Sequence, residues 1–267
     1  MNPSLLWYPT ERHIPVVGHR GVSAHCPENT LPSFEAAIRL GVDLIEFDVN
    51  VSKDGELMVI HDTTVDRTSD RTGRVRDYTL AELKSFDFSY TFPEYRGVQI
   101  PTLREVLRLV SDSSDKLLLN VEIKDMEHGT VDRTVRMLKE FDLADRSVIA
   151  SFDAEILRYT HAAHPEMRCQ GFSGRYMEHF EAETYACMLG MGIPLHGKNR
   201  TDAEIRAEID FAKERGILAW LFTADTPEDV RRCVSFGCDN VTGNDPAVAL
   251  NTLRDMGMHS PVNVRAK

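Results

Sequence analysis

The sequence predicts an α/β fold, a (β/α)8 (TIM) barrel with a small insertion over the carboxyl-terminal face of its strands. From about residue 14 onward, short β-branched runs alternate with amphipathic helical stretches, the pattern of parallel strands joined by crossover helices. Eight such runs are present in 267 residues. An eight-stranded barrel takes about 250 residues, so a single domain covering 1–267 is expected.

The expected barrel strands, in chain order, are 15–18, 44–49, 117–123, 147–151, 168–172, 192–196, 218–222 and 240–242. Helices fit between them, and three carry clear end signals. The helix expected over 30–40 has a proline in its first turn, and that over 201–215 begins with a capping-box pattern, Thr-Asp-Ala-Glu. The helix over 227–236 is followed by Gly237, the residue type that best tolerates a left-handed stop.

One apolar run, 56–61, does not fit the parallel series. Only residues 53–55 separate it from the second strand, too few for a crossover, so it is expected to return antiparallel as the second arm of a hairpin. With the turn centred between residues 54 and 55, Asp48 would pair opposite His61. The hairpin would then bring His61 to the carboxyl end of the second strand.

The barrel rhythm breaks over 63–99, where a polar stretch is followed by aromatic residues. We interpret this stretch as an insertion packed over the top of the barrel, because linkers carry fewer aromatics. Its aromatic residues are Tyr78, Phe86, Phe88, Tyr90, Phe92 and Tyr95.

Composition narrows the class of protein. No apolar stretch reaches membrane-spanning length, and the chain starts with neither a basic leader nor a secretory apolar run, so a cytoplasmic protein without stable membrane insertion is expected. The net charge of −11 disfavours nucleic acid as a partner. The five cysteines are scattered and never spaced C-x-x-C, which suggests neither zinc nor disulfides.

Carboxylates gather on two of the expected strands. Glu46 and Asp48 share one face of the second strand, and Glu122 shares a face with Lys124 on the next. Three carboxylates without cysteine favour a hard divalent ion, Mg²⁺ or Ca²⁺. The alternative is a salt-bridge network in which Arg20 and Lys124 merely neutralise the carboxylates.

His19 and His61 each stand where a short apolar strand ends. Arg20 follows His19 with a fork of donors suited to phosphate, and Gly21 lets the backbone approach a ligand closely. Two imidazoles beside carboxylates are the parts of a metal-assisted acid/base site. The alternative is that each histidine only caps its strand. The remaining single histidines, taken as surface or loop residues, are His25, His161 and His164.

These segments resemble the glycerophosphodiester phosphodiesterase family, in particular its cytosolic bacterial-type enzymes. The resemblance rests on motifs in the family's order and spacing: His19-Arg20-Gly21, Pro27-Glu28-Asn29-Thr30, Glu46-x-Asp48, Lys53-Asp54-Gly55, His61-Asp62, Pro101-Thr102-Leu103, Glu122-Ile123-Lys124, and onward through Trp220 to Asn244-Asp245-Pro246. It covers nearly the whole chain. The 63–99 stretch sits where that family carries its characteristic insertion.

The resemblance implies cleavage of a glycerophosphodiester to sn-glycerol 3-phosphate and an alcohol. In the family's usual scheme the glycerol 2-hydroxyl attacks phosphorus to give a cyclic phosphate, which water then opens. The resemblance also implies residue roles: one divalent metal on Glu46, Asp48 and Glu122, general base and acid from His19 and His61, and phosphate binding by Arg20 and Lys124. It does not say which histidine is the base.

The second half departs from the family pattern. The penultimate strand has Trp220-Leu221-Phe222-Thr223 where the family commonly reads Trp-Thr-Val-Asn, and 192–196 also differs. Trp220 is expected either to stack on the glycerol or to be a barrel-core aromatic, and His196 is a further ligand candidate. The rival activities are a lysophospholipase D-type phosphodiesterase and a non-catalytic barrel that binds phosphodiesters. Head group, choice of metal and oligomeric state stay open.

Overall fold

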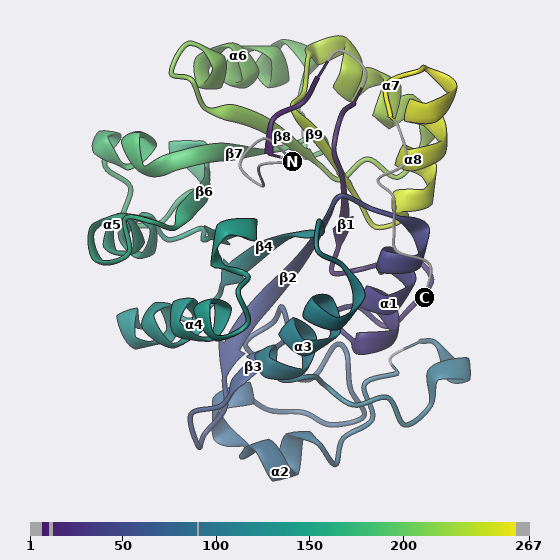
Figure 1. The fold of residues 1–267 in the computed structure, drawn as a ribbon, viewed down its shortest axis with the longest axis vertical. Coiled ribbons are helices and arrows are strands. Elements are labelled where there is room, and N and C mark those ends of the chain that lie inside the picture. Colours follow the sequence, from purple (N-terminus) through teal and green to yellow (C-terminus); the bar gives the residue numbers. More distant parts are fainter. Residues whose placement is uncertain (1–6, 11–12, 90, 260–267) are drawn as a thin grey trace.

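The computed structural model describes residues 7–10, 13–89 and 91–259, and its strands form a closed barrel surrounded by helices (Figure 1). The parallel strands are β1 (Val16–His19), β2 (Leu44–Val51), β4 (Leu118–Ile123), β5 (Ser147–Ala150), β6 (Arg168–Phe172), β7 (Met188–Pro194), β8 (Leu218–Phe222) and β9 (Asn240–Gly243). They pair in chain order, and β1 pairs with both β2 and β9, which closes the barrel. The predicted (β/α)8 fold is confirmed.

The helices lie outside the barrel (Figure 1). They are α1 (Leu31–Leu40), α2 (Leu80–Leu83), α3 (Leu103–Ser113), α4 (His128–Glu140), α5 (Ala154–Ala163), α6 (Asp202–Lys213), α7 (Pro227–Phe236) and α8 (Pro246–Asp255). Short 3₁₀ turns are η2 (Val75–Asp77), η3 (Pro93–Tyr95), η4 (Ala144–Arg146), η5 (Gly174–Tyr176) and η6 (Ala182–Cys187). The predicted end signals are confirmed: Thr201 and Glu204 form a capping box at α6, and Gly237 ends α7 at φ 77°.

The hairpin prediction was right in kind and wrong in register. Strand β3 (Leu57–Val59) runs antiparallel to β2, but the turn is a three-residue loop centred on Asp54, closed by Ser52 N donating to Glu56 O at 3.0 Å. Asp48 therefore lies opposite Ile60, whose N–H donates to its carbonyl at 3.0 Å, and His61 follows the paired segment. The extra loop residue, Gly55 at φ 86°, accounts for the one-residue shift.

Strand β7 begins four residues earlier than predicted and ends at Pro194, which leaves His196 in the following loop. Its glycines made the amino-terminal half a poor strand candidate, but they make room for neighbours inside the barrel. A Cβ at Gly190 would lie 2.7 Å from the Trp220 ring, and one at Gly192 would lie 2.6 Å from the Phe172 ring.

Side chains alternate between two environments along the barrel strands. On β2, Ile45 and Phe47 pack outward in the main core against the helices. Leu44 faces inward, in an apolar cluster with Trp7 and Trp220 at the amino-terminal end of the barrel. The alternation therefore turns the carboxylates Glu46 and Asp48 toward the interior, as predicted.

The insertion has a small core of its own. Val65, Val75, Leu83, Phe86 and Phe88 pack with residues of the hairpin, beside β3 and α3 in Figure 1. Tyr90 lies outside the described residues. The insertion's polar contacts reach the loops at the carboxyl ends of the barrel strands, as described below for Arg67.

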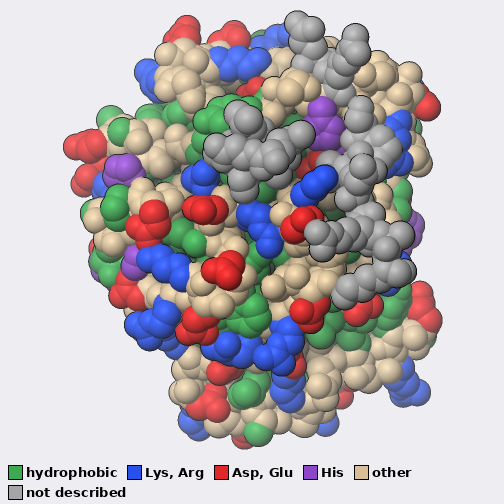
Figure 2. Space-filling model, viewed as in Figure 1, with side chains coloured by type: hydrophobic (Ala, Val, Ile, Leu, Met, Phe, Trp, Pro, Cys, Tyr) green, Lys and Arg blue, Asp and Glu red, His purple; other side chains and the backbone are tan. Residues whose placement is uncertain are grey.

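Acidic and basic side chains are interspersed on the face of the molecule seen in Figure 2. Among the described residues, no helix is both long enough and apolar enough to cross a membrane. All five cysteines are free thiols, and four of them are buried.

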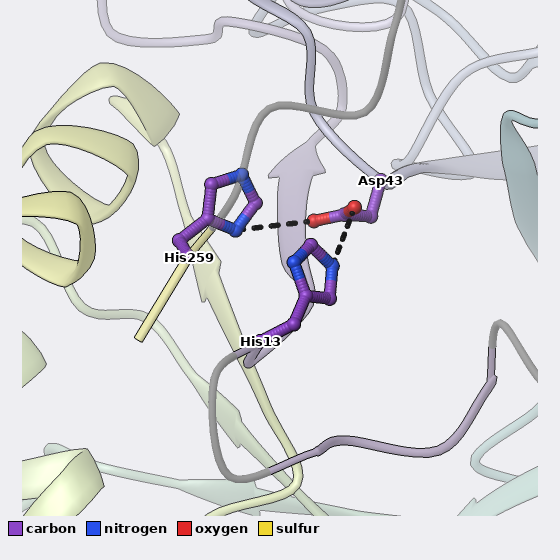
Figure 3. Close-up of side chains that lie close together, drawn as sticks. All are labelled: His13, Asp43 and His259. Carbon is purple, nitrogen blue, oxygen red and sulfur yellow. Dashed lines mark hydrogen bonds and ion pairs between the residues drawn. The ribbon is translucent and has the colours of Figure 1, made fainter. Parts of the chain in front are cut away.

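A buried carboxylate joins the segments at the amino-terminal end of the barrel (Figure 3). Asp43 lies just before β2; it accepts a hydrogen bond from Val16 N at 2.8 Å and pairs with His13 Nε2 at 3.0 Å. His259, beyond α8, brings Nδ1 within 3.8 Å of the same carboxylate and stacks on His13 with ring centroids 4.5 Å apart. Burial lowers the pKa of His259 and so favours its neutral form.

We expect Asp43→Ala to lower the free energy of unfolding by about 2–4 kcal/mol, because it strands the buried Val16 N–H and removes the carboxylate that both histidines contact. Urea denaturation measures the loss. Glu140→Ala, which breaks an exposed pair with Arg104, is the control and should change stability by no more than about 0.5 kcal/mol. Equal effects of the two variants would contradict the role given to Asp43.

Candidate functional site

A cavity of about 320 Å³ opens at the carboxyl ends of the barrel strands. In a (β/α)8 barrel this end carries the active site. One wall is charged and the other aromatic. The charged wall contains His19, Arg20, Glu46, His61, Glu122 and Lys124, and the aromatic wall contains Phe152, Phe172, Trp220 and Phe222.

Three carboxylates from neighbouring strands meet at the charged wall. In the barrel register Glu46 of β2 lies beside His19 of β1, and Asp48 lies beside Glu122 of β4. One oxygen from each carboxylate lies within 4.8 Å of the others. Side-chain exposure is only 8%, 1% and 11% for Glu46, Asp48 and Glu122.

Burial raises the pKa of Glu46 well above its usual value, and the neighbouring charges of Asp48 and Glu122 raise it further. Burial also raises the pKa of Glu122. For Asp48 burial acts in the same direction, but Lys124 and Arg20 outweigh it and bring the pKa to about 2.

The two cations only partly neutralise this group. Lys124 Nζ pairs with Glu122 Oε1 and lies 3.2 Å from Asp48 Oδ1, and Arg20 Nε lies 3.4 Å from Asp48 Oδ2. Asp48 Oδ1 is buried and accepts no hydrogen bond among the described residues. An excess carboxylate and a buried oxygen that accepts no hydrogen bond fit a hard divalent cation, which carries the missing charge and coordinates oxygen. The group could therefore hold a metal ion.

His19 ends β1 and lies beside the carboxylates, with Nε2 3.9 Å from Glu46 Oε2. Its Nδ1 is 2.7 Å from Asn244 Oδ1. Burial, helped by the charge of Arg20, lowers the pKa of His19 to about 4, so the ring is neutral near pH 7.

His61 lies on the same wall and is half-buried. Its Nδ1 pairs with Asp62 Oδ1 at 2.6 Å. Burial lowers the pKa of His61, while Asp48 and Asp62 act in the opposite direction. The two imidazoles thus share the cavity but have different partners, an asparagine amide for His19 and a carboxylate for His61.

Backbone geometry explains why Arg20 reaches the carboxylates. Its φ is 54°, a left-handed conformation, and its N–H donates to Glu46 Oε2 at 3.0 Å. Gly21 follows at φ 89°, and a Cβ there would lie 2.3 Å from Ser33 Oγ. The turn after β1 therefore requires glycine at position 21.

Three further residues contact the site. Asn29 and Glu28 belong to a motif named above, which assigned them no role, and Arg67 was not predicted from the sequence. Asn29 Nδ2 donates to Asp48 Oδ2 at 2.8 Å, and Glu28 pairs with Arg20 at 2.9 Å. Arg67, from the insertion, bonds both Glu28 and Asp62, at 2.6 and 2.8 Å. Spacing carries no signal for Arg67, because the contact depends on how the insertion folds back.

The phenylalanines of the aromatic wall contact one another, and Phe152 also adjoins Lys124, whose Nζ lies 5.6 Å from its ring centroid. Phe152 stacks on Phe172 with ring centroids 3.5 Å apart, and Phe222 meets Phe172 edge-on at 5.8 Å. Trp220, 4% exposed, lines the cavity and stacks on Trp7 at 5.9 Å. Its ring therefore belongs both to the barrel interior and to the cavity.

The other histidines lie away from the carboxylate group. His196 is at the cavity rim and pairs with Asp229 at 3.1 Å. His25 is an exposed loop residue, as predicted, and pairs with Asp245 at 2.8 Å. His161 is exposed and His164 is half-buried at the end of α5, where it pairs with Asp132 at 2.8 Å.

Comparisons with known proteins agree with this geometry. The model of the glycerophosphoryl diester phosphodiesterase family matches residues 19–248. The chain is 34% identical over 255 residues to a glycerophosphodiester phosphodiesterase of Caldanaerobacter subterraneus subsp. tengcongensis, covering 91% of this chain and 98% of that protein. It is 29% identical over 252 residues to one of Bacillus subtilis, covering 86% and 83%.

Solved structures show the same likeness. A phosphodiesterase of Oleispira antarctica, in complex with the product sn-glycerol-3-phosphate, matches with a TM-score of 0.80 at 27% identity, covering 94% of this chain and 99% of that one. A chain from Silicibacter pomeroyi matches with a TM-score of 0.83 at 22% identity, covering 97% and 99%, and supports the fold. By sequence and by fold, the chain belongs to the glycerophosphodiester phosphodiesterase family.

Proposed function

We propose that this protein is a metal-dependent phosphodiesterase that hydrolyses glycerophosphodiesters to sn-glycerol 3-phosphate and an alcohol. The observation that carries the proposal is the buried group of three carboxylates, two of which line one cavity together with two histidines and two cations. The product bound in the Oleispira antarctica relative supports a small glycerophosphate-containing substrate.

Glu46, Asp48 and Glu122 would hold one divalent ion, Mg²⁺ or Ca²⁺, since all three offer hard oxygen donors. When bound, the ion would neutralise charge on the phosphodiester and polarise its phosphorus–oxygen bonds. Asn29 would keep Asp48 in place through its hydrogen bond to Oδ2.

Arg20 and Lys124 would bind the phosphate oxygens. Both are held at the cavity by the carboxylates, and the mutual attraction raises the pKa of Lys124 despite its burial. The Glu28–Arg67 pair behind Arg20 would fix the direction of its guanidinium group.

His19 and His61 would move the protons of the reaction. One would take the proton of the attacking glycerol hydroxyl, and the other would give a proton to the oxygen of the leaving alcohol. The aromatic wall, with Trp220 as a stacking surface for the glycerol carbons, would flank the substrate.

The five free thiols support a cytoplasmic location for the protein, because thiols stay reduced in the cytoplasm.

Removal of divalent ions is expected to abolish activity and to lower the melting temperature, because the ion stabilises the folded state that binds it. The experiment is dialysis against EDTA, followed by titration of Mg²⁺ or Ca²⁺ while product release from glycerophosphocholine is measured. Glu122→Gln should weaken the metal response, whereas Glu155→Gln, an exposed carboxylate on α5, should not. Full activity in excess EDTA would refute the metal dependence.

We expect His19→Ala and His61→Ala each to lower kcat by about 10²-fold or more, the usual scale for a lost general acid or base. Circular dichroism should show an intact fold. His161→Ala, an exposed histidine on α5, is the matched control and should leave kcat unchanged. A near-normal kcat in either cavity variant would return that histidine to a purely structural role.

Arg20→Lys is expected to raise KM and lower kcat, with a combined cost of about 2–4 kcal/mol in kcat/KM, because lysine cannot reproduce a two-pronged contact to phosphate oxygens. Steady-state kinetics on glycerophosphoethanolamine measure both constants. Arg39→Lys, at an exposed position of α1, should behave as wild type. If Arg20→Lys did so too, Arg20 would not contact the phosphate.

A further inference from the structure

We infer that Asn244, held by Asp225, positions His19 so that its unprotonated Nε2 faces the substrate, as a general base requires. The inference rests on the proposed function. It adds Asn244 and Asp225 as positioning residues and assigns the base role to His19. Asn244 and Asp225 are not among the residues that line the cavity, so they would act through His19.

The hydrogen bonds of Asn244 leave one orientation for its amide. Asn244 Nδ2 lies 2.6 Å from Asp225 Oδ2, and an ionised carboxylate can only accept a hydrogen bond. The amide nitrogen must therefore face Asp225, and the amide oxygen must face His19. Ser23 Oγ, 3.0 Å from the same amide oxygen, can donate to it in this orientation.

The orientation of the amide selects one tautomer of His19. Asn244 Oδ1 is 2.7 Å from His19 Nδ1 and can only accept, so Nδ1 must carry the hydrogen. A neutral imidazole protonated at Nδ1 has its lone pair at Nε2. That atom is on the side of Glu46 and the cavity, where a general base has to meet its proton.

Asp225 is itself fixed by several contacts. Its Oδ1 accepts the backbone N–H of Asn244 at 2.6 Å and lies 3.3 Å from that of Asp245, so it binds the start of the loop after β9 as well as the side chain. Ala224 N donates to Thr242 O at 2.9 Å, which joins the loops after β8 and β9.

Gly243 permits this close approach of the two loops. A Cβ at that position would lie 2.8 Å from Ala224 O, a backbone atom that could not move aside without breaking the join. Gly243 thus leaves space for Asp225 to approach, and Asn244 provides the amide that Asp225 orients. The chain Asp225–Asn244–His19 is a base with its orienting groups.

The primary test is Asn244→Ala. We expect kcat on glycerophosphocholine to fall about 10- to 100-fold with KM within about 2-fold of wild type, because the variant loses an orienting bond and no substrate contact. Nitrogen-15 NMR of the His19 ring gives a readout independent of activity, with the signals assigned by their absence in His19→Gln. The wild-type ring should hold its proton on Nδ1, and Asn244→Ala should shift it toward Nε2.

Exchanging Asn244 and Asp225 tests whether the hydrogen bonds from Asp225 through Asn244 to His19 set the tautomer. In Asn244→Asp/Asp225→Asn, the new carboxylate can accept from His19 Nδ1 and from the amide nitrogen at 225, whose oxygen still accepts from the backbone at 244. We expect kcat to recover at least 10-fold over Asn244→Ala, with the ring proton back on Nδ1. Thr226→Ala, which removes only the cap of α7 in the same loop, should lower stability but leave kcat and the tautomer unchanged.

An Asn244→Ala enzyme with wild-type kcat, or with reduced kcat but the proton still on Nδ1, would overturn the inference. Failure of the exchanged pair to restore the Nδ1 proton would do so as well. If the wild type cleaved no glycerophosphodiester, the proposed function would fall. The NMR comparison would still decide whether Asn244 sets the tautomer.

Discussion

The site depends on a buried excess of negative charge. Three carboxylates lie at the charged wall against two cations, and burial opposes ionisation of all three. Such a group is stable only if further positive charge joins it or if one carboxyl takes up a proton. The same imbalance that opposes burial of the three carboxylates makes the group receptive to a divalent cation.

The barrel brings these charged groups together without disturbing the packing between its strands and helices. Parallel register sets Glu46 beside His19 and Asp48 beside Glu122, while strand alternation keeps apolar residues on the outer face. The amino-terminal end of the interior is apolar, closed by Trp7, and tied by Asp43. The cluster of charged groups therefore lies at the open, carboxyl-terminal end, and the apolar amino-terminal end of the interior supports it.

Local patterns predicted most of the fold and the contents of the charged wall, because alternation and motif spacing act over a few residues. They failed where the outcome depends on partners far along the chain. The hairpin register depended on one glycine in a loop, and the start of β7 depended on glycines that accommodate Trp220 and Phe172. Arg67 and Asp225 could not be found, since Arg67 meets Glu28 across 39 residues and Asp225 meets Asn244 across 19.

The stacking of Trp7 on Trp220 has a practical consequence. These are the chain's two tryptophans, and one of them lines the cavity. Tryptophan fluorescence, excited selectively beyond tyrosine absorption, therefore originates from a single pair of rings that spans the apolar end of the barrel and the cavity. We therefore expect the emission of this pair to change when a ligand enters the cavity or when the Trp7 segment loosens.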